Sequence, residues 1–300
     1  FGVMVQPQQS KYIQDYQGVH VDTVRNVVNV SPTLDFRYRF SKMSNLRINY
    51  RGTTSQPSIS QLLDITDNSD PLNISMGNPG LKPSFTQNFR LFYNNFVQNH
   101  NKGIMTFVNF STTNNSISNK VTYDETTGGR ITRPENINGN WNAMGAFMFN
   151  CSIDSAGVWN INTGAHANYN NYVSYLSLDK KSDSQKNTTR SITWRQNLSF
   201  SYRNDWAEFS LDGTLTYNKA KNKLQPTSNL ETWQFSYGPS MTLTAPWGTS
   251  LNSSLSINSR RGYNDSSMNT DEFVWNAQLS QGFLKGKPLT IMLQFYDILR

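Results

Sequence analysis

Apolar and polar residues alternate along much of the chain, most clearly in residues 34–40 and 46–50. The apolar series is Leu34, Phe36, Tyr38, Phe40, Leu46, Ile48 and Tyr50. The polar series between them is Asp35, Arg37, Arg39, Arg47, Asn49 and, next to the second segment, Arg51. Successive side chains of a β-strand point to opposite faces, so the pattern predicts an antiparallel hairpin with one apolar face and one charged face.

The same unit recurs along the rest of the sequence. Further hairpins are predicted for residues 85–97 with 103–118, 141–153 with 158–178, 191–202 with 206–219, 233–243 with 247–258, and 272–283 with 289–296. Residues 1–9 and 24–40 add two strands around a polar loop at 10–23, and Pro32, which has no N–H, predicts a bulge or a strand start. The total is about thirteen strands.

The connections alternate between short and long. Short turns lie at 41–45, 98–101, 154–157, 203–205, 244–246 and 284–288, whereas the polar stretches 54–84, 119–140, 179–190, 220–232 and 259–271 are long. Transmembrane barrels have short turns at one rim and long loops at the other. Phe40, Trp206, Trp247 and Phe283 flank short turns, as an interfacial aromatic belt would. The pattern favours an all-β, antiparallel up-and-down transmembrane β-barrel over a soluble β-sandwich or β-solenoid that binds glycans or acts as an adhesin.

Composition narrows the function classes. The 300 residues are 36% hydrophobic, 13% aromatic and 16% charged, the last below the roughly 25% of ordinary soluble domains. The net charge of +7 is spread along the chain, so no nucleic-acid partner is expected. The single cysteine, Cys151, excludes an internal disulfide framework. No run approaches about 18 consecutive apolar residues, so no transmembrane helix is predicted.

Strand parity predicts that the barrel region extends beyond this chain. If the short turns share one rim, residues 1–9 and 289–296 both run toward the long-loop rim. A strand should then precede the first and follow the last. Because bacterial barrels have an even strand number, an odd count predicts that residues 1–300 are a single barrel region forming a fragment of a larger barrel. A passive porin, complete within one chain, is correspondingly disfavoured.

Two motifs add a resemblance to a known family. Residues 50–62, followed by Asn78-Pro79-Gly80-Leu81-Lys82-Pro83 and the strand 85–96, resemble the C-terminal barrel region of TonB-dependent outer-membrane receptors of the Bacteroidetes type. Residues 295–300 resemble the stretch before that family's final strand. The resemblance implies a 22-stranded barrel closed by an N-terminal plug in the outer membrane of a Gram-negative cell. It also implies energised uptake of a large nutrient, such as a glycan, peptide or metal chelate.

The resemblance further implies the partners: outer-membrane lipid, the TonB complex reached through a plug, and a surface lipoprotein. Neither the plug nor a TonB-contacting segment occurs among the 300 residues.

The sequence motifs predict neither an enzymatic activity nor a bound cofactor. His20, His100 and His166 lack metal-ligand spacing, and no nucleophile or phosphate-loop motif is present. Residues 64–70 have the composition of a calcium loop but lack its Gly and closing Glu, which leaves only an adventitious calcium site open. The candidate ligand contacts are the lumen-facing residues Arg37, Arg39, Arg47, Arg51 and His166, with Tyr123 in a loop. An alternative for the arginines is ion pairing with carboxylates of neighbouring strands or of the plug.

Overall fold

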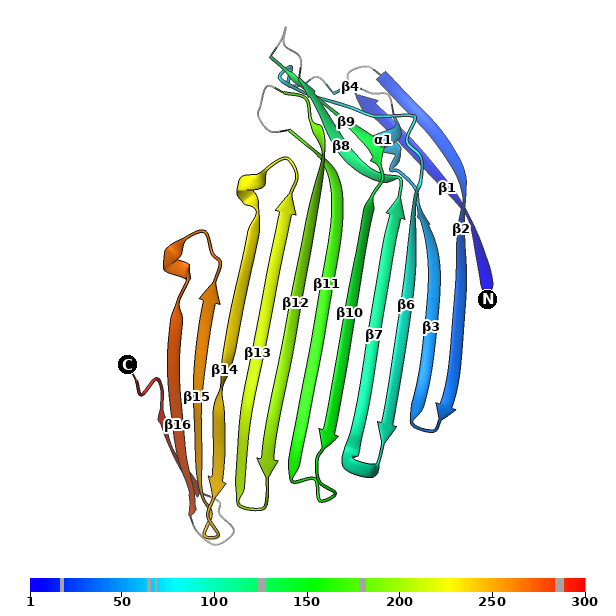
Figure 1. The fold of residues 1–300 in the computed structure, drawn as a ribbon. Helices are drawn as coiled ribbons and strands as arrows, with labels where there is room; N and C mark the ends of the chain where they lie inside the picture. The colour runs from blue at the N-terminus through cyan, green and yellow to red at the C-terminus, as the bar shows by residue number, and fades with distance from the viewer. Residues whose placement is uncertain are drawn as a thin grey trace.

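The computed structural model describes residues 1–16, 19–63, 66–67, 69–123, 128–177, 182–283 and 289–299. Thirteen strands form one curved antiparallel meander (Figure 1). From edge to edge they are β1 (Gly2–Tyr16), β2 (Val19–Ser41), β3 (Ser44–Ser55), β6 (Ser84–Val97), β7 (Lys102–Asn114), β10 (Asn140–Ser152), β11 (Trp159–Leu176), β12 (Gln185–Arg203), β13 (Ala207–Asn222), β14 (Leu230–Thr244), β15 (Thr249–Arg261), β16 (Asp271–Phe283) and β17 (Leu289–Phe295). Within this part of the chain β1 pairs only with β2, and β17 only with β16.

The predicted hairpins and the parity of the connections are confirmed. Short turns join the strands at the lower rim in Figure 1, and the longer connections lie at the upper rim. Three of the connections contain short 3₁₀ helices: η1 (Asn99–Asn101), η2 (Pro226–Ser228) and η3 (Ser266–Met268). The turn at 284–288 lies outside the described residues, although Phe283 and Leu289 on either side are paired.

Two expectations for the first strands were wrong. Residues 10–16 and 19–23 do not form a loop, because β1 and β2 stay paired from Gly2↔Thr33 to Tyr16↔Val19. Pro32 causes no bulge, since its pairing with Val3 leaves that register unbroken. Proline has no N–H to donate. The pairing of β2 with β3 ends at Thr33, the residue next to Pro32, while the pairing of β2 with β1 continues past Pro32.

The sequence suggested polar loops at 54–84 and 119–140, but the described residues of these long connections contain regular elements. They contribute α1 (Ile59–Leu62) and a second sheet of β4 (Thr66–Asp67), β5 (Asn73–Met76), β9 (Arg130–Ile137) and β8 (Ser116–Tyr123). This sheet lies at the upper rim, and its β5–β9 pair is parallel (Figure 1). The expected turn at Asn78-Pro79-Gly80 is present, with the Leu81 N–H donating to the Asn78 carbonyl.

Aromatic side chains form two bands on the apolar face of the large sheet. The upper band crosses five neighbouring strands, with ring centroids 4.7–6.3 Å apart, through Tyr50, Phe89, Phe110, Trp141 and Tyr169. The lower band includes Trp159, Tyr202 and Phe209. Trp159 and Tyr169 lie ten residues apart on β11. At about 3.4 Å per residue and a tilt of about 40°, this separation is roughly 26 Å in height.

The interior core of the protein is small. Among the described residues the buried hydrophobic side chains are Leu81, Ile137, Val173 and Ala207. Large apolar side chains such as Leu198 and Leu211 remain more than half exposed. The described residues contain no helix with the length and apolar character needed to cross a membrane. Within the described residues, the apolar face of the large sheet is therefore not covered by another layer of protein.

Candidate functional site

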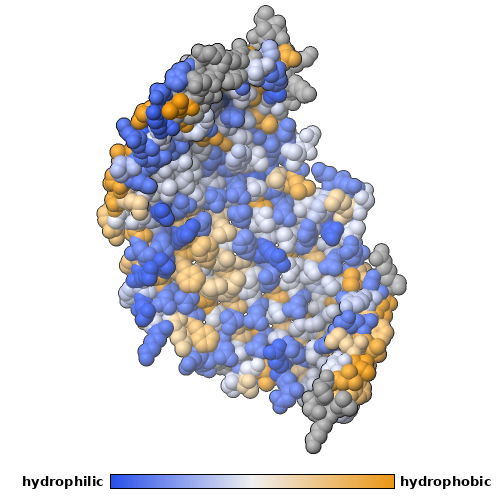
Figure 2. Space-filling view, turned by 180° about the vertical axis from the view of Figure 1, so that it is seen from behind, coloured by the Kyte–Doolittle hydropathy of each residue, from blue (hydrophilic) through white to orange (hydrophobic). Residues whose placement is uncertain are grey.

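The candidate site is the polar face of the large sheet, called here the inner wall. Residues that pair across antiparallel strands share a face, so the registers define it. One row runs across seven strands through Arg37, Arg47, Phe92, Phe107, Ala146, His166 and Arg195. Figure 2 shows a largely hydrophilic face that carries a hydrophobic patch near its middle.

Two of the predicted arginines are held by one carboxylate. The Arg37 Nε atom lies 3.0 Å from Asp35 Oδ1, and an Arg47 terminal nitrogen lies 2.9 Å from Asp35 Oδ2. Asp35 and Arg37 are two apart on β2, which places them on the same face, and Arg47 lies opposite Arg37 on β3. The alternative left open by the sequence, pairing with a carboxylate of a neighbouring strand, is thus confirmed for Arg47, whereas Arg37 pairs with a carboxylate of its own strand.

The other predicted contacts are scattered. Arg39 and Arg51 lie on the same wall, and within the described part of the chain no hydrogen bond or ion pair reaches their guanidinium groups. His166 shares the row of Arg47 but lies four strands away, about 19 Å at ordinary strand spacing. Tyr123 belongs to β8 of the second sheet, where its backbone N–H donates to the Asp183 carboxylate. The six predicted residues therefore do not form one site.

The hydrophobic patch on the inner wall comes from β6, β7 and β10. Phe92 pairs with Phe107, and Met105 pairs with Met148, so these four share the polar face. Phe92 is 36% exposed, Met105 39% and Met148 52%. The inward residues of this patch, including its neighbours on the same strands, are Phe92, Phe96, Met105, Phe107, Met144, Ala146 and Met148. This patch was not among the features predicted from the sequence.

A polar hollow of about 460 Å³ indents the same wall between β12 and β16. Two cations, Arg195 and Arg260, line it together with the carboxylate Glu272. Neutral hydrogen-bonding side chains of the inner wall lie between them: Thr214, Thr216, Gln234, Ser236 and Asn258. Arg195 was not among the contacts predicted from the sequence. The next residue, Gln196, is polar although it points outward, so polar and apolar residues do not alternate clearly at this point of the chain.

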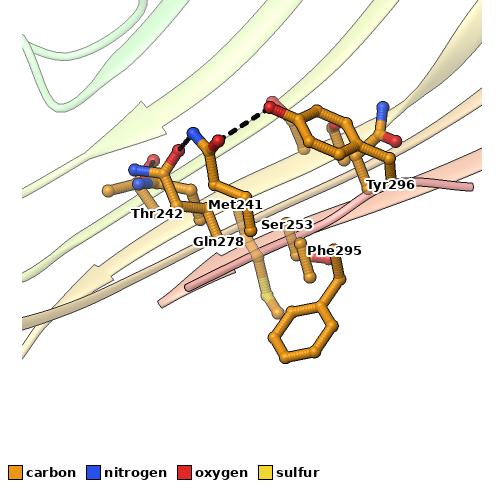
Figure 3. A pocket seen from close by; sticks show the side chains of 12 residues that line it. Met241, Thr242, Ser253, Gln278, Phe295 and Tyr296 are labelled. Atoms are coloured by element: carbon orange, nitrogen blue, oxygen red, sulfur yellow. Dashed lines mark hydrogen bonds between the residues drawn. The ribbon is translucent and has the colours of Figure 1, made fainter. Parts of the chain in front are cut away.

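A second, smaller hollow of about 230 Å³ lies near the last strands. Figure 3 shows Gln278 and Tyr296 on one side of these strands and Phe295 pointing to the other. The Gln294 amide donates to Gln278 Oε1 at 3.0 Å, and the Tyr296 hydroxyl donates to Gln294 Oε1 at 2.8 Å. These groups partner one another, which makes this hollow a weaker candidate than the one between β12 and β16.

The comparison with known families decides the setting of the sheet. The outer membrane protein beta-barrel family matches residues 10–208, about two thirds of the chain. The chain belongs to this family. No curated protein and no solved structure matches it. The predicted location in the Gram-negative outer membrane is thereby confirmed, and the alternative of a secreted soluble protein was wrong.

Family membership assigns the two faces of this outer membrane β-barrel. The apolar face contacts lipid, and the polar inner wall faces the barrel interior. The height of roughly 26 Å between the aromatic bands matches the apolar belt of about 25 Å that is typical of such barrels. The exposed residues Phe40, Trp206, Trp247 and Phe283, predicted as an interfacial belt, lie at the short-turn rim. In such barrels this rim faces the periplasm and the long connections are extracellular.

Three extracellular connections of the barrel are joined into a folded cap. The Asn136 side chain accepts from the Lys82 N–H at 2.8 Å and donates to the Lys82 and Asn115 carbonyls. Ser184, between β11 and β12, donates its N–H to the Val121 carbonyl of β8 at 2.7 Å. These contacts hold the second sheet against the extracellular rim.

The described residues contain no candidate metal site. No group of three or more potential ligands is found there. The proposed calcium segment lies partly outside them, since 64, 65 and 68 are not described. The Asp70 carboxylate instead accepts from the Leu72 N–H and the Asn73 amide, and these contacts hold the pKa of Asp70 below its usual value. The absence of an enzymatic activity stays a prediction.

Proposed function

We propose that this outer membrane β-barrel is part of a TonB-dependent receptor that takes up a large nutrient. The observation that carries the proposal is the hydrophobic patch on the inner wall. The interior of a barrel is typically polar where it is filled with water. Contiguous exposed apolar patches usually mark a surface that another protein segment or a ligand covers. A folded plug inside the barrel accounts for the patch, and a passive porin does not.

The edges of the sheet support a larger barrel. Unpaired strand edges are not tolerated in hydrocarbon, because lipid offers no hydrogen-bond partner. β1 and β17 each lack a neighbour on one side within the described residues. We therefore propose that further strands pair with them and close the barrel, as in the 22-stranded receptors that the sequence resembles. The plug, the TonB complex and a surface lipoprotein belong to this proposal as partners.

The charges of the inner wall indicate which arginines are candidates for contacting the substrate. Asp35 neutralises part of the charge of Arg37 and Arg47, whereas Arg39 and Arg51 have no partner in the described residues. The unpaired guanidinium groups are therefore better candidates for contacting a solute than the paired ones. Exchanging Arg39 and Arg51 for Gln should slow uptake of an anionic nutrient more than exchanging Arg37 and Arg47.

The test uses the full-length protein in its own outer membrane. A photoreactive phenylalanine analogue replaces Met148 in the inner patch, and a matched variant carries it at Phe147, the next residue, on the lipid face. We expect the Met148 variant to cross-link within the protein to a segment outside the barrel strands, and the Phe147 variant to cross-link to lipid. Uptake should also stop when the proton gradient is collapsed. Cross-linking of Met148 only to solutes, with uptake independent of the gradient, would refute the receptor in favour of a passive pore.

A further inference from the structure

We propose that the inner-wall hollow between β12 and β16 binds an anionic, hydroxyl-rich part of the nutrient, about the size of a disaccharide, such as two sugar units of an acidic glycan. The proposal rests on the uptake function and names the substrate class for it. The hollow holds about 460 Å³, within the roughly 300–1,000 Å³ of small-molecule sites.

The charges of the hollow favour an anion. Within the described residues no hydrogen bond or ion pair reaches the guanidinium groups of Arg195 and Arg260. This contrasts with Arg37 and Arg47, which share Asp35. Glu272 is the acid in the lining, so the two arginines leave an excess of one positive charge. A guanidinium group binds a carboxylate or phosphate through paired N–H donors, so each arginine is prepared for one acidic group.

The spacing of the arginines sets the size of the ligand. Arg195, Thr216, Gln234 and Arg260 occupy one row on β12, β13, β14 and β15. Three strand spacings separate the two arginine backbones by about 14 Å. Their long side chains can reach toward each other and hold the two ends of one solute. Thr216 and Gln234 lie beneath its middle, where neutral donors and acceptors suit hydroxyl groups.

The hollow lies next to the extracellular rim. Arg260 is the penultimate residue of β15, beside the connection 262–270. Tyr263 of that connection accepts a hydrogen bond from the Gln234 amide, and its backbone carbonyl accepts one from the Asn269 side chain at 3.0 Å. These contacts hold the Gln234 side chain, which lines the hollow, and leave Gln234 Oε1 available as an acceptor. A solute that passes the cap meets this site early in its path.

Binding to the full-length protein in detergent tests the proposal. The probe is digalacturonate, which carries two carboxylates on two sugar rings. Its neutral methyl ester and suberate, a dicarboxylate without hydroxyl groups, are the comparison ligands, and calorimetry measures the affinity. We expect digalacturonate to bind more tightly than either, and its affinity to fall with salt. Arg195→Gln and Arg260→Gln should each weaken binding about tenfold, as for loss of a hydrogen bond to a charged group.

Arg90→Gln is the matched control, because Arg90 is an inner-wall arginine on β6 outside the hollow. It should leave the affinity unchanged, and heat-modifiable migration on a detergent gel should show that all three variants fold. Equal loss in all three variants, or equal binding of the methyl ester, overturns the proposed site. Arginine-dependent binding without gradient-dependent uptake would retain the site and overturn the uptake function. Gradient-dependent uptake without arginine-dependent binding would retain the uptake function and overturn the site.

Discussion

A charge placed on the lipid face of the barrel gives the sharpest test of the face assignment. Leu198 of β12 points to the lipid face and is 55% exposed. It lies four residues above Tyr202 of the lower aromatic band, about 10 Å in height for a tilted strand. The belt is roughly 26 Å tall, so Leu198 lies near the bilayer midplane. We predict that Leu198→Arg strongly destabilises the barrel.

The magnitude follows from this depth. Arginine on the lipid face at the midplane costs about 2–4 kcal/mol. The folding equilibrium constant should therefore fall about 30-fold to 700-fold. The neighbouring residue provides the control, because Asn197 pairs with Thr214 on the inner wall. Asn197→Arg directs the same charge toward water, and its cost should stay within about 0.5 kcal/mol.

Reversible urea unfolding of the full-length protein in lipid vesicles measures the free energy of unfolding of Leu198→Arg and of Asn197→Arg. Heat-modifiable migration on a gel shows how much of each variant has folded. If Leu198→Arg costs no more than Asn197→Arg, the apolar face does not contact lipid and the assignment of the inner wall fails with it.

Three further changes test local features. Asn136→Ala removes the side chain that joins two extracellular connections, so limited proteolysis of the cap should accelerate while barrel unfolding stays unchanged; slower or equal cleavage would contradict the cap. The Asp154 carboxylate accepts hydrogen bonds from the Trp159 and Val158 N–H groups, and these hold the pKa of Asp154 below its usual value. The ionised carboxylate therefore stabilises this turn above about pH 4, and the stabilisation is lost as pH falls through the lowered pKa. Unfolding rates should rise over that acidic range in wild type and less in Asp154→Asn. A Cβ at Gly238 would lie 1.7 Å from the Leu255 carbonyl oxygen, so Gly238→Ala should destabilise the barrel by about 1–3 kcal/mol in the same urea assay.

The sequence predicted the strands best where the sheet crosses the membrane. There one face meets lipid and the other the interior, so residues such as Leu34, Asp35, Phe36 and Arg37 must alternate. A slip of one residue would expose arginine to lipid, which is why the predicted hairpins appear in the register that the pattern required.

The same reasoning failed above the membrane. Both faces of a strand meet water there, and the alternation no longer distinguishes a strand from a loop. The upper half of β1, residues 19–23 of β2 and most of the second sheet were therefore predicted as loops. Their pairing depends on contacts such as Asn136 with Lys82, which join segments far apart in sequence.

The sequence by itself determined the strand period, the parity of the connections and the belt of Phe40, Trp206, Trp247 and Phe283 beside the short turns, because each follows from neighbours within one strand or hairpin. Only the tertiary structure showed that Asp35 pairs with both Arg37 and Arg47, that Phe107 and Met148 belong to an apolar patch on the inner wall, and that Arg195 and Arg260 share a hollow. Those groupings depend on the register between strands up to 65 residues apart. Pairing across a sheet, unlike alternation along a strand, is fixed only when the whole meander has formed.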